Sequence, residues 1–341
     1  MRGLMRLERE GGVEVWQRSV DAAKAALQNL LSMGGEDRLL VIYDDPLERI
    51  AKAFFEAGQQ LGSAQLLSFF PDLEDRATCL GRLVQNLESY GPTVAVTAFR
   101  DLPGETTFRI AALETLAEFG LRVGHMPGVR YEWLVEGPLA LTHEEYQDLA
   151  AKARALMERL ESVRRLHIAN PDGTEFSCIV EGRQWRSDCV PGASWMINLP
   201  VGEIYIAPIE RSAEGKVVVR GTIGGVGVPK APVVIEVKNG QMVSVSSEDE
   251  EFRRKVQIVL TVDEGARWLG EVGIGLNPRA SPFADKMLEA EKAAGTMHVA
   301  FGYNRLFGGR IRSKMHNDMV LLEPTLEADG EEILKDGKLR L

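Results

Sequence analysis

Cysteine is scarce in this chain of 341 residues, which holds only Cys79, Cys178 and Cys189. An odd, sparse set without C-x-x-C spacing argues against a disulfide framework and against a structural zinc site held by thiolates. Unpaired cysteine in small number is typical of proteins from a reducing compartment, so we expect a cytoplasmic location.

Long apolar runs and an excess of basic residues are also missing. No stretch approaches the roughly 18 uninterrupted apolar residues of a membrane span, and the charged start MRGLMRLEREGG has no apolar core typical of secretory signals. The formal net charge is −10, because 40 lysines and arginines face 50 aspartates and glutamates. We therefore expect a soluble protein whose partners are neither nucleic acid nor membrane.

What is present is the composition of an ordinary globular protein, with 45% hydrophobic and 26% charged residues. Its length favours two domains. In the first half, segments of helical period alternate with short apolar runs, which is typical of a parallel sheet covered by helices. The expected strands are 37–45, 64–70, 92–99 and 121–127, and the expected helices are 13–33, 46–62, 105–120 and a bridging helix at 143–166.

From about residue 166 the pattern changes to strands broken by turns. RLHIANPDGTEFSCIVEG indicates a strand, a Pro-Asp-Gly turn and a second strand. The glycines of GTIGGVGVP lead into the strand-like VVIEV and not into a helix, which favours hairpin turns over a phosphate-binding loop. We predict an α/β domain with a parallel sheet over 1–165, followed by a strand-rich α+β domain over 166–341.

Carboxylates and imidazoles occur inside apolar, glycine-flanked segments of this second half. Glu203 lies in INLPVGEIYIAP, Glu271 in WLGEVGIGLNP and His298 in GTMHVAFGYN. His316 and Asp318, in SKMHNDMVLL, are two residues apart and so share one face of a strand. Burying a carboxylate costs several kcal/mol unless it is compensated. A local ion pair could compensate each one, but a shared divalent cation would explain all four segments together.

The chemistry of this set points to particular metals. Nitrogen and oxygen ligands without thiolate suit Zn²⁺, Co²⁺, Mn²⁺ or Fe²⁺. Five ligands exceed the need of one tetrahedral zinc with an open position, and they suit two metals about 3.5–4 Å apart with a bridging carboxylate. A metal-binding catalytic domain with this set could perform metal-assisted hydrolysis, with Glu203 or Glu271 as general base if one of them is not fully coordinated.

The order of the motifs NLPVGEIYIAP, LGEVGIG, HVAFG and SKMHNDM resembles the thermophilic aminopeptidase T family of metallopeptidases. The likeness extends from NPDGTEF to Asp318 and includes the first half only in its general α/β character. It implies a two-metal exopeptidase, usually a homodimer, that removes N-terminal residues from peptides or small amides. It also implies the metal ligands, with Glu271 as a candidate bridge: Glu203, Glu271, His298, His316 and Asp318.

The chain departs from the family at one catalytic position. The family usually has a tyrosine seven residues after the histidine of HVAFG, whereas this chain has Arg305 there and a tyrosine at Tyr303. Either side chain could donate to a developing oxyanion. The alternation of faces is secure only as far as about Gly302, and Arg305 could instead pair with a surface acid.

Two alternatives stay open. His298, His316 and Asp318 alone would form the two-histidine, one-carboxylate triad that holds Fe(II) in non-haem oxygenases. Ring-cleaving pyridinediol dioxygenases resemble the chain in fold and in the final His-x-Asp, although a histidine stands at their equivalent of Glu271. The other alternative is a non-catalytic protein that keeps a structural metal.

Overall fold

A computed structural model describes residues 12–69, 76–102, 105–192 and 194–340. The chain forms two compact units, which are Met1–Asp148 with Val190–Val201 and Leu149–Cys189 with Gly202–Leu341. It thus returns to the first unit for one short segment before it enters the second unit again. A single boundary near residue 165 stays a prediction.

The first unit is built on a parallel sheet with the strand order β2-β1-β3-β4-β8. Its apolar runs form strands that are buried along their length, as expected where both faces of a parallel sheet are covered. This confirms the predicted α/β half. The strands are β1 (Arg38–Asp44), β2 (Ser63–Phe69), β3 (Val94–Phe99), β4 (Arg122–Pro127) and β8 (Met196–Asn198).

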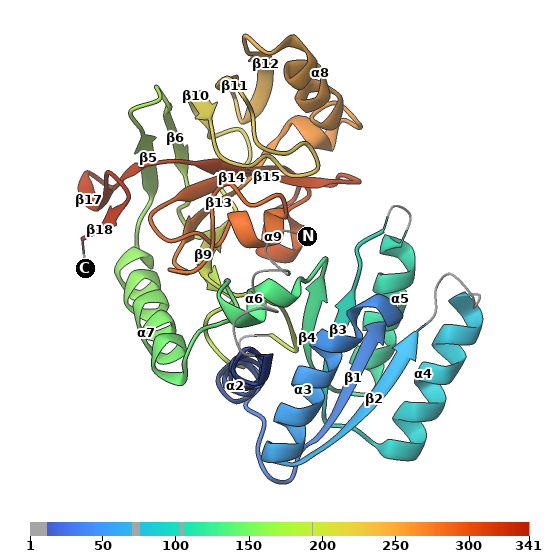
Figure 1. Cartoon of the computed structure of the whole chain (residues 1–341). Coiled ribbons are helices and arrows are strands. Elements are labelled where there is room, and N and C mark those ends of the chain that lie inside the picture. Colours follow the sequence, from blue (N-terminus) through green and yellow to red (C-terminus); the bar gives the residue numbers. More distant parts are fainter. Residues whose placement is uncertain (1–11, 70–75, 103–104, 193, 341) are drawn as a thin grey trace. The chain divides into compact units, whose positions relative to one another are not determined.

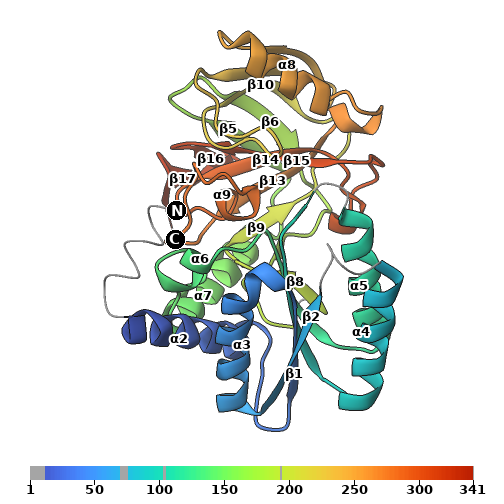
Figure 2. The ribbon, with the colours of Figure 1, turned by 45° about the vertical axis from the view of Figure 1, so that its right-hand side comes forward.

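Helices cover both faces of this sheet, with α4 and α5 on one face and α3 on the other (Figures 1 and 2). Helix α4 was not among the predicted helices, although Cys79, Leu83 and Leu87 repeat every four residues and pack into the core. No described helix is both long and apolar enough to span a lipid bilayer. The helices are α2 (Gly12–Leu30), α3 (Glu48–Leu61), α4 (Arg76–Tyr90), α5 (Thr106–Glu118), α6 (Tyr131–Val135) and α7 (His143–Leu160).

A buried imidazole in β4 makes the stability of this unit depend on pH. His125 is 6% exposed, and its Nδ1 lies 2.6 Å from the hydroxyl oxygen of Thr97. Burial, the larger influence, and the nearby Arg109 lower the pKa of His125 from 6.5 to about 3. Below pH 6.5 the unfolded chain therefore takes up a proton that the folded chain does not, and the free energy of unfolding falls by about 1.4 kcal/mol per pH unit.

Replacing His125 with asparagine should remove this dependence. In urea denaturation, the wild type should lose about 2 kcal/mol more than His125→Asn when the pH is lowered from about 7 to about 5. His143→Asn changes an exposed imidazole at the start of α7 and should keep the wild-type dependence. Equal losses for the wild type and His125→Asn would contradict the prediction.

The second unit contains two antiparallel sheets. The larger has the strand order β12-β11-β10-β6-β5-β16-β17-β18. The predicted Pro-Asp-Gly turn joins β5 to β6, and Asn239 and Gly240 turn the chain from β11 to β12 with φ values of 49° and 76°. Its strands are β5 (Arg165–Ala169), β6 (Glu175–Ile179), β10 (Glu214–Val219), β11 (Val233–Lys238), β12 (Gln241–Ser246), β16 (Thr325–Ala328), β17 (Glu331–Lys335) and β18 (Lys338–Leu339).

The smaller sheet has the order β15-β14-β13-β9-β7 and carries the predicted ligands. Its strands are β7 (Arg186–Ser187), β9 (Glu203–Ile206), β13 (Leu269–Gly275), β14 (Met297–Gly302) and β15 (His316–Leu321). Short helices complete the unit, as expected for a strand-rich α+β fold: α8 (Glu250–Val259), η2 (Gly265–Arg267), α9 (Met287–Ala290) and η3 (Arg305–Phe307).

Candidate metal centre

The register of the smaller sheet brings all five predicted ligands to one face. Side chains two residues apart share a face, and directly paired residues of neighbouring strands share it too. Each ligand residue is paired with a residue that has a small side chain or none: His298 with Gly273, Glu203 with Gly275, Glu271 and Asp318 with Ala300, and His316 with Gly302. The small residues leave room for the ligand side chains between the strands.

Gly273 shows how tight this arrangement is. A Cβ atom at this position would lie 2.1 Å from both Cε1 and Nε2 of His298. The imidazole therefore occupies the space that a side chain on the neighbouring strand would fill. This explains why the apolar run around Glu271 is interrupted by glycine.

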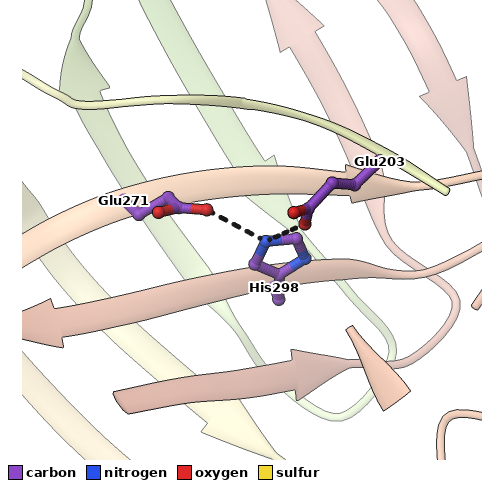
Figure 3. A group of neighbouring side chains, drawn as sticks. All are labelled: Glu203, Glu271 and His298. Carbon is purple, nitrogen blue, oxygen red and sulfur yellow. Dashed lines mark hydrogen bonds and ion pairs between the residues drawn. The ribbon is translucent and has the colours of Figure 1, made fainter. Parts of the chain in front are cut away.

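The first group of ligand atoms consists of Glu203, Glu271 and His298 (Figure 3). Nε2 of His298 lies 3.1 Å from Oε2 of Glu203 and 3.3 Å from Oε1 of Glu271. All three side chains are buried, and His298 is 0% exposed. One atom of each residue lies within 4.8 Å of the others, which is close enough to surround one cation.

The second group consists of Glu271, His316 and Asp318. Nε2 of His316 lies 3.4 Å from Oε2 of Glu271 and 3.4 Å from Oδ1 of Asp318. Glu271 therefore belongs to both groups, with one oxygen toward each imidazole. Among the described residues, these are the two groups with such spacing, and they separate His298 from His316.

His316 is held in a fixed orientation at the open side of the centre. Its Nδ1 donates a hydrogen bond of 2.8 Å to the carbonyl oxygen of Tyr303. This bond directs Nε2 toward the carboxylates, and in the neutral ring it leaves Nε2 free as a metal ligand. The His316 side chain is 25% exposed, more than any other member of the two groups, so the centre opens to solvent here.

The titration of these groups reflects strong pairing. Burial alone would lower the pKa of His316, but Asp318 and Glu271 outweigh it and raise the pKa to about 10. Burial likewise opposes ionisation of Asp318, yet His316 lowers the pKa of this carboxyl to about 2. The pocket therefore favours positive charge on its imidazoles, and a divalent ion would bring such charge while it displaces their protons.

Hydrogen bonding within the pocket is incomplete without a cation. Oε2 of Glu203, Oε2 of Glu271 and Nδ1 of His298 are buried and have no hydrogen-bond partner. The single Nε2 proton of His298 cannot satisfy both carboxylates that approach it. Buried charged atoms without partners are costly. The donor set of carboxylate oxygens and imidazole nitrogens therefore fits divalent ions.

Three further charged residues, which were not predicted from the sequence, adjoin the centre. Nζ of Lys292 contacts Oε1 of Glu203 and lies 3.2 Å from Oδ2 of Asp188 and 2.9 Å from Oε1 of Glu291. Burial lowers the pKa of Lys292, but these three carboxylates outweigh it and raise the pKa well above its usual value. The charged segment LEAEKAAG around Lys292 carries no local signal of its burial.

The segment after β14 lies beside the open side of the centre. Strand β14 ends at Gly302, so the alternation of faces does not extend to Arg305, which begins η3 with an exposed side chain. Buried Asn304 fixes the segment by donating to the carbonyl oxygen of Gly270 and accepting from the backbone N–H of Ile311. The ring centroids of Phe307 and His316 are 5.1 Å apart.

Comparison with known proteins decides the family. The profile of the thermophilic metalloprotease (M29) family matches residues 140–337. The chain belongs to this family. The resemblance inferred from the motifs is thus confirmed, and the chain is a metal-dependent hydrolase of the thermophilic metalloprotease class. No curated protein sequence matches it significantly.

Two solved structures share the fold of this thermophilic metalloprotease over nearly its whole length. Wild-type AmpT from Thermus thermophilus is 19% identical, with a TM-score of 0.67, and the match covers 95% of this chain and 99% of that one. A 2,5-dihydroxypyridine dioxygenase from Pseudomonas putida KT2440 is also 19% identical, with a TM-score of 0.71 and coverage of 94% and 96%. At this identity the likeness concerns the fold alone.

Proposed function

We propose that this metalloprotease is an aminopeptidase that removes N-terminal residues from peptides with the help of two divalent ions. One observation carries the two-ion proposal. Glu271 directs Oε1 toward His298 and Oε2 toward His316, as a carboxylate does when it bridges two ions. Glu203 and His298 would complete one site, and His316 and Asp318 the other.

The charges of the residues around the centre also support two bound ions. Burial raises the pKa of Glu291 to about 8, and bound cations would lower it again. With all five carboxylates ionised and the imidazoles neutral, these carboxylates and one ammonium give a formal charge of −4, which two divalent ions would cancel. One ion would leave a charge of −2 in a buried pocket, which is costly. The groups counted are Asp188, Glu203, Glu271, Glu291, Asp318 and Lys292.

Bound ions and side chains of this chain would share the steps of peptide hydrolysis. Bound ions would polarise the scissile carbonyl and lower the pKa of a water molecule. Glu203 was predicted as ligand and general base, but Lys292 holds its Oε1, and this favours the role of ligand for Oε2. The carbonyl oxygen of Tyr303 accepts a hydrogen bond from His316, and Arg305 begins the helical turn whose Phe307 ring packs near His316, so we assign the oxyanion contact to Tyr303 or Arg305.

The oxygenase alternative finds less support. An iron triad of His298, His316 and Asp318 would need both imidazoles on one ion, whereas the two belong to different groups. Glu203 and Glu271 would have no role in such a triad. The match to the dioxygenase structure is a likeness of fold only.

A comparison of turnover with and without oxygen tests the reaction class. Leucine p-nitroanilide or a short peptide should be cleaved at the same rate in anaerobic and aerated buffer, because hydrolysis consumes no oxygen. Chelator should stop the reaction, and Zn²⁺, Co²⁺ or Mn²⁺ should restore it. Oxygen uptake with a dihydroxypyridine, together with no cleavage of the anilide, would overturn the proposal.

Three finer parts of the proposal rest on the family resemblance and the composition. They are zinc, cobalt or manganese as the native metal, a homodimeric assembly with an isologous interface, and a cytoplasmic location. Elemental analysis, light scattering and cell fractionation would test them in turn.

A further inference from the structure

Lys292 is an unusual residue to find beside a centre that binds cations. It follows α9 and is 2% exposed, although lysine is almost never fully buried unless it is paired. Its ammonium contacts three carboxylates, of which only Glu203 belongs to the two proposed metal sites. The other two, Asp188 and Glu291, have no direct place in those sites.

The contact with Lys292 gives the two carboxylate oxygens of Glu203 different surroundings. Oε1 accepts a hydrogen bond from Nζ of Lys292, while Oε2 lies 3.1 Å from Nε2 of His298 and has no hydrogen-bond partner. Only Oε2 therefore points to the proposed ion. Chelation by both oxygens would require Glu203 to leave the ammonium buried without one of its partners, which is costly.

Hydrogen bonds to the backbone fix the surroundings of both Glu203 and Lys292. Oδ1 of Asp188 accepts hydrogen bonds from the N–H groups of Gly202, at 2.9 Å, and Glu203, at 3.0 Å, while its Oδ2 faces Lys292. The carbonyl oxygen of Lys292 accepts from the N–H of Asn277 at 2.8 Å. A Cβ on Gly202 would lie 3.2 Å from Cβ of Lys292, so the two backbones pack closely.

We propose that Lys292 is a positioning residue that restricts Glu203 to one metal-binding oxygen and thereby keeps a coordination position of the ion open for substrate. The inference rests on the proposed two-ion function. Asp188 contacts both the ammonium of Lys292 and the backbone N–H of Glu203, and it supports the same positioning. Without the ammonium, Glu203 is free to turn and chelate with both oxygens.

Cobalt supplies a readout of this geometry that does not depend on turnover. The visible absorption of Co²⁺ weakens as its coordination number rises. In Lys292→Met, Co²⁺ should bind in the same stoichiometry as in the wild type but with a weaker visible band. The kcat for leucine p-nitroanilide should fall about tenfold, which is the scale for partners that orient metal ligands.

A second variant separates positioning from simple charge balance. Lys292→Met/Asp188→Asn removes one positive and one negative charge, while the asparagine oxygen can still accept from the N–H groups of Gly202 and Glu203, so the net charge of the pocket returns to that of the wild type. If Lys292 positions Glu203, the double variant should keep the weak band and the low kcat. Recovery of both would assign the effect to charge balance and overturn the proposal.

The remaining outcomes are equally decisive. A wild-type protein that binds no Co²⁺ would refute the two-ion function itself, whereas a wild-type band and kcat in Lys292→Met would refute only the role of Lys292. If Lys292→Met does not fold, Lys292→Met/Asp188→Asn carries the test, because it leaves one fewer buried carboxylate without the ammonium. A wild-type Co²⁺ band in the folded double variant would overturn the proposal.

Discussion

Glu271→Gln should bind less than one divalent ion per chain, where we expect up to two for the wild type. The amide has one neutral oxygen and an NH₂ group in place of two charged oxygens, so it cannot serve both His298 and His316. The loss of Lewis-acid stabilisation, several kcal/mol, corresponds to a fall in kcat of about 10³-fold or more. Elemental analysis after gel filtration and anilide turnover are the measurements.

Single-site variants give this experiment its controls. His298→Ala and His316→Ala should each weaken one site more than the other, since each imidazole belongs to one group. His167→Ala removes a surface imidazole that pairs with Glu175, and it should leave metal content unchanged. Full loading of Glu271→Gln with two ions would show that this carboxylate is not the bridge.

Arg305→Ala should lower kcat about 10²-fold while metal content stays the same, because that is the scale of losing one oxyanion donor. The guanidinium is exposed and, within the described part of the chain, makes no ion pair. Phe307, in the same helical turn, lies against His316 at the open side of the centre. The prediction rests on this short separation in the chain between Arg305 and Phe307.

Two variants in the same segment sharpen this test. Arg310→Ala removes an exposed arginine whose backbone N–H, which the substitution keeps, bonds to Glu210, and turnover should stay near wild type. Tyr303→Phe should matter less than Arg305→Ala if the arginine has taken over the donor role. A near-wild-type kcat in Arg305→Ala would show that Arg305 has no catalytic role and would leave Tyr303 as the candidate donor.

The candidate ligands could be found in the sequence because charged or polar side chains are unusual among apolar neighbours. Glu203, Glu271 and His298 stand in apolar runs broken by glycine, and the two-residue spacing of His316 and Asp318 sets them on one face. Local sequence patterns do not give the strand register, by which Glu271, among the residues that the structure describes, is the one shared by both ligand groups. Pairing between strands depends on contacts far apart in the chain.

Other features lay beyond local patterns for the same reason. Lys292 stands in a charged segment, LEAEKAAG, that is typical of a solvated surface, and only tertiary packing buries it. Strand β8 has three residues and follows a strand-rich stretch of the other unit, so nothing nearby links it to the parallel sheet. Propensity is a weak guide where such distant contacts decide the outcome.

The late arrival of β8 has a consequence for synthesis on the ribosome. Its partner β4 ends at Pro127, and the chain must grow by about 70 further residues before Met196 to Asn198 can pair with it. During that interval the nascent first unit presents a bare strand edge, which is a template for aggregation. The same short stretch, Val190–Val201, leads directly into Glu203, so the segment that completes the parallel sheet is synthesised immediately before the first metal-site carboxylate.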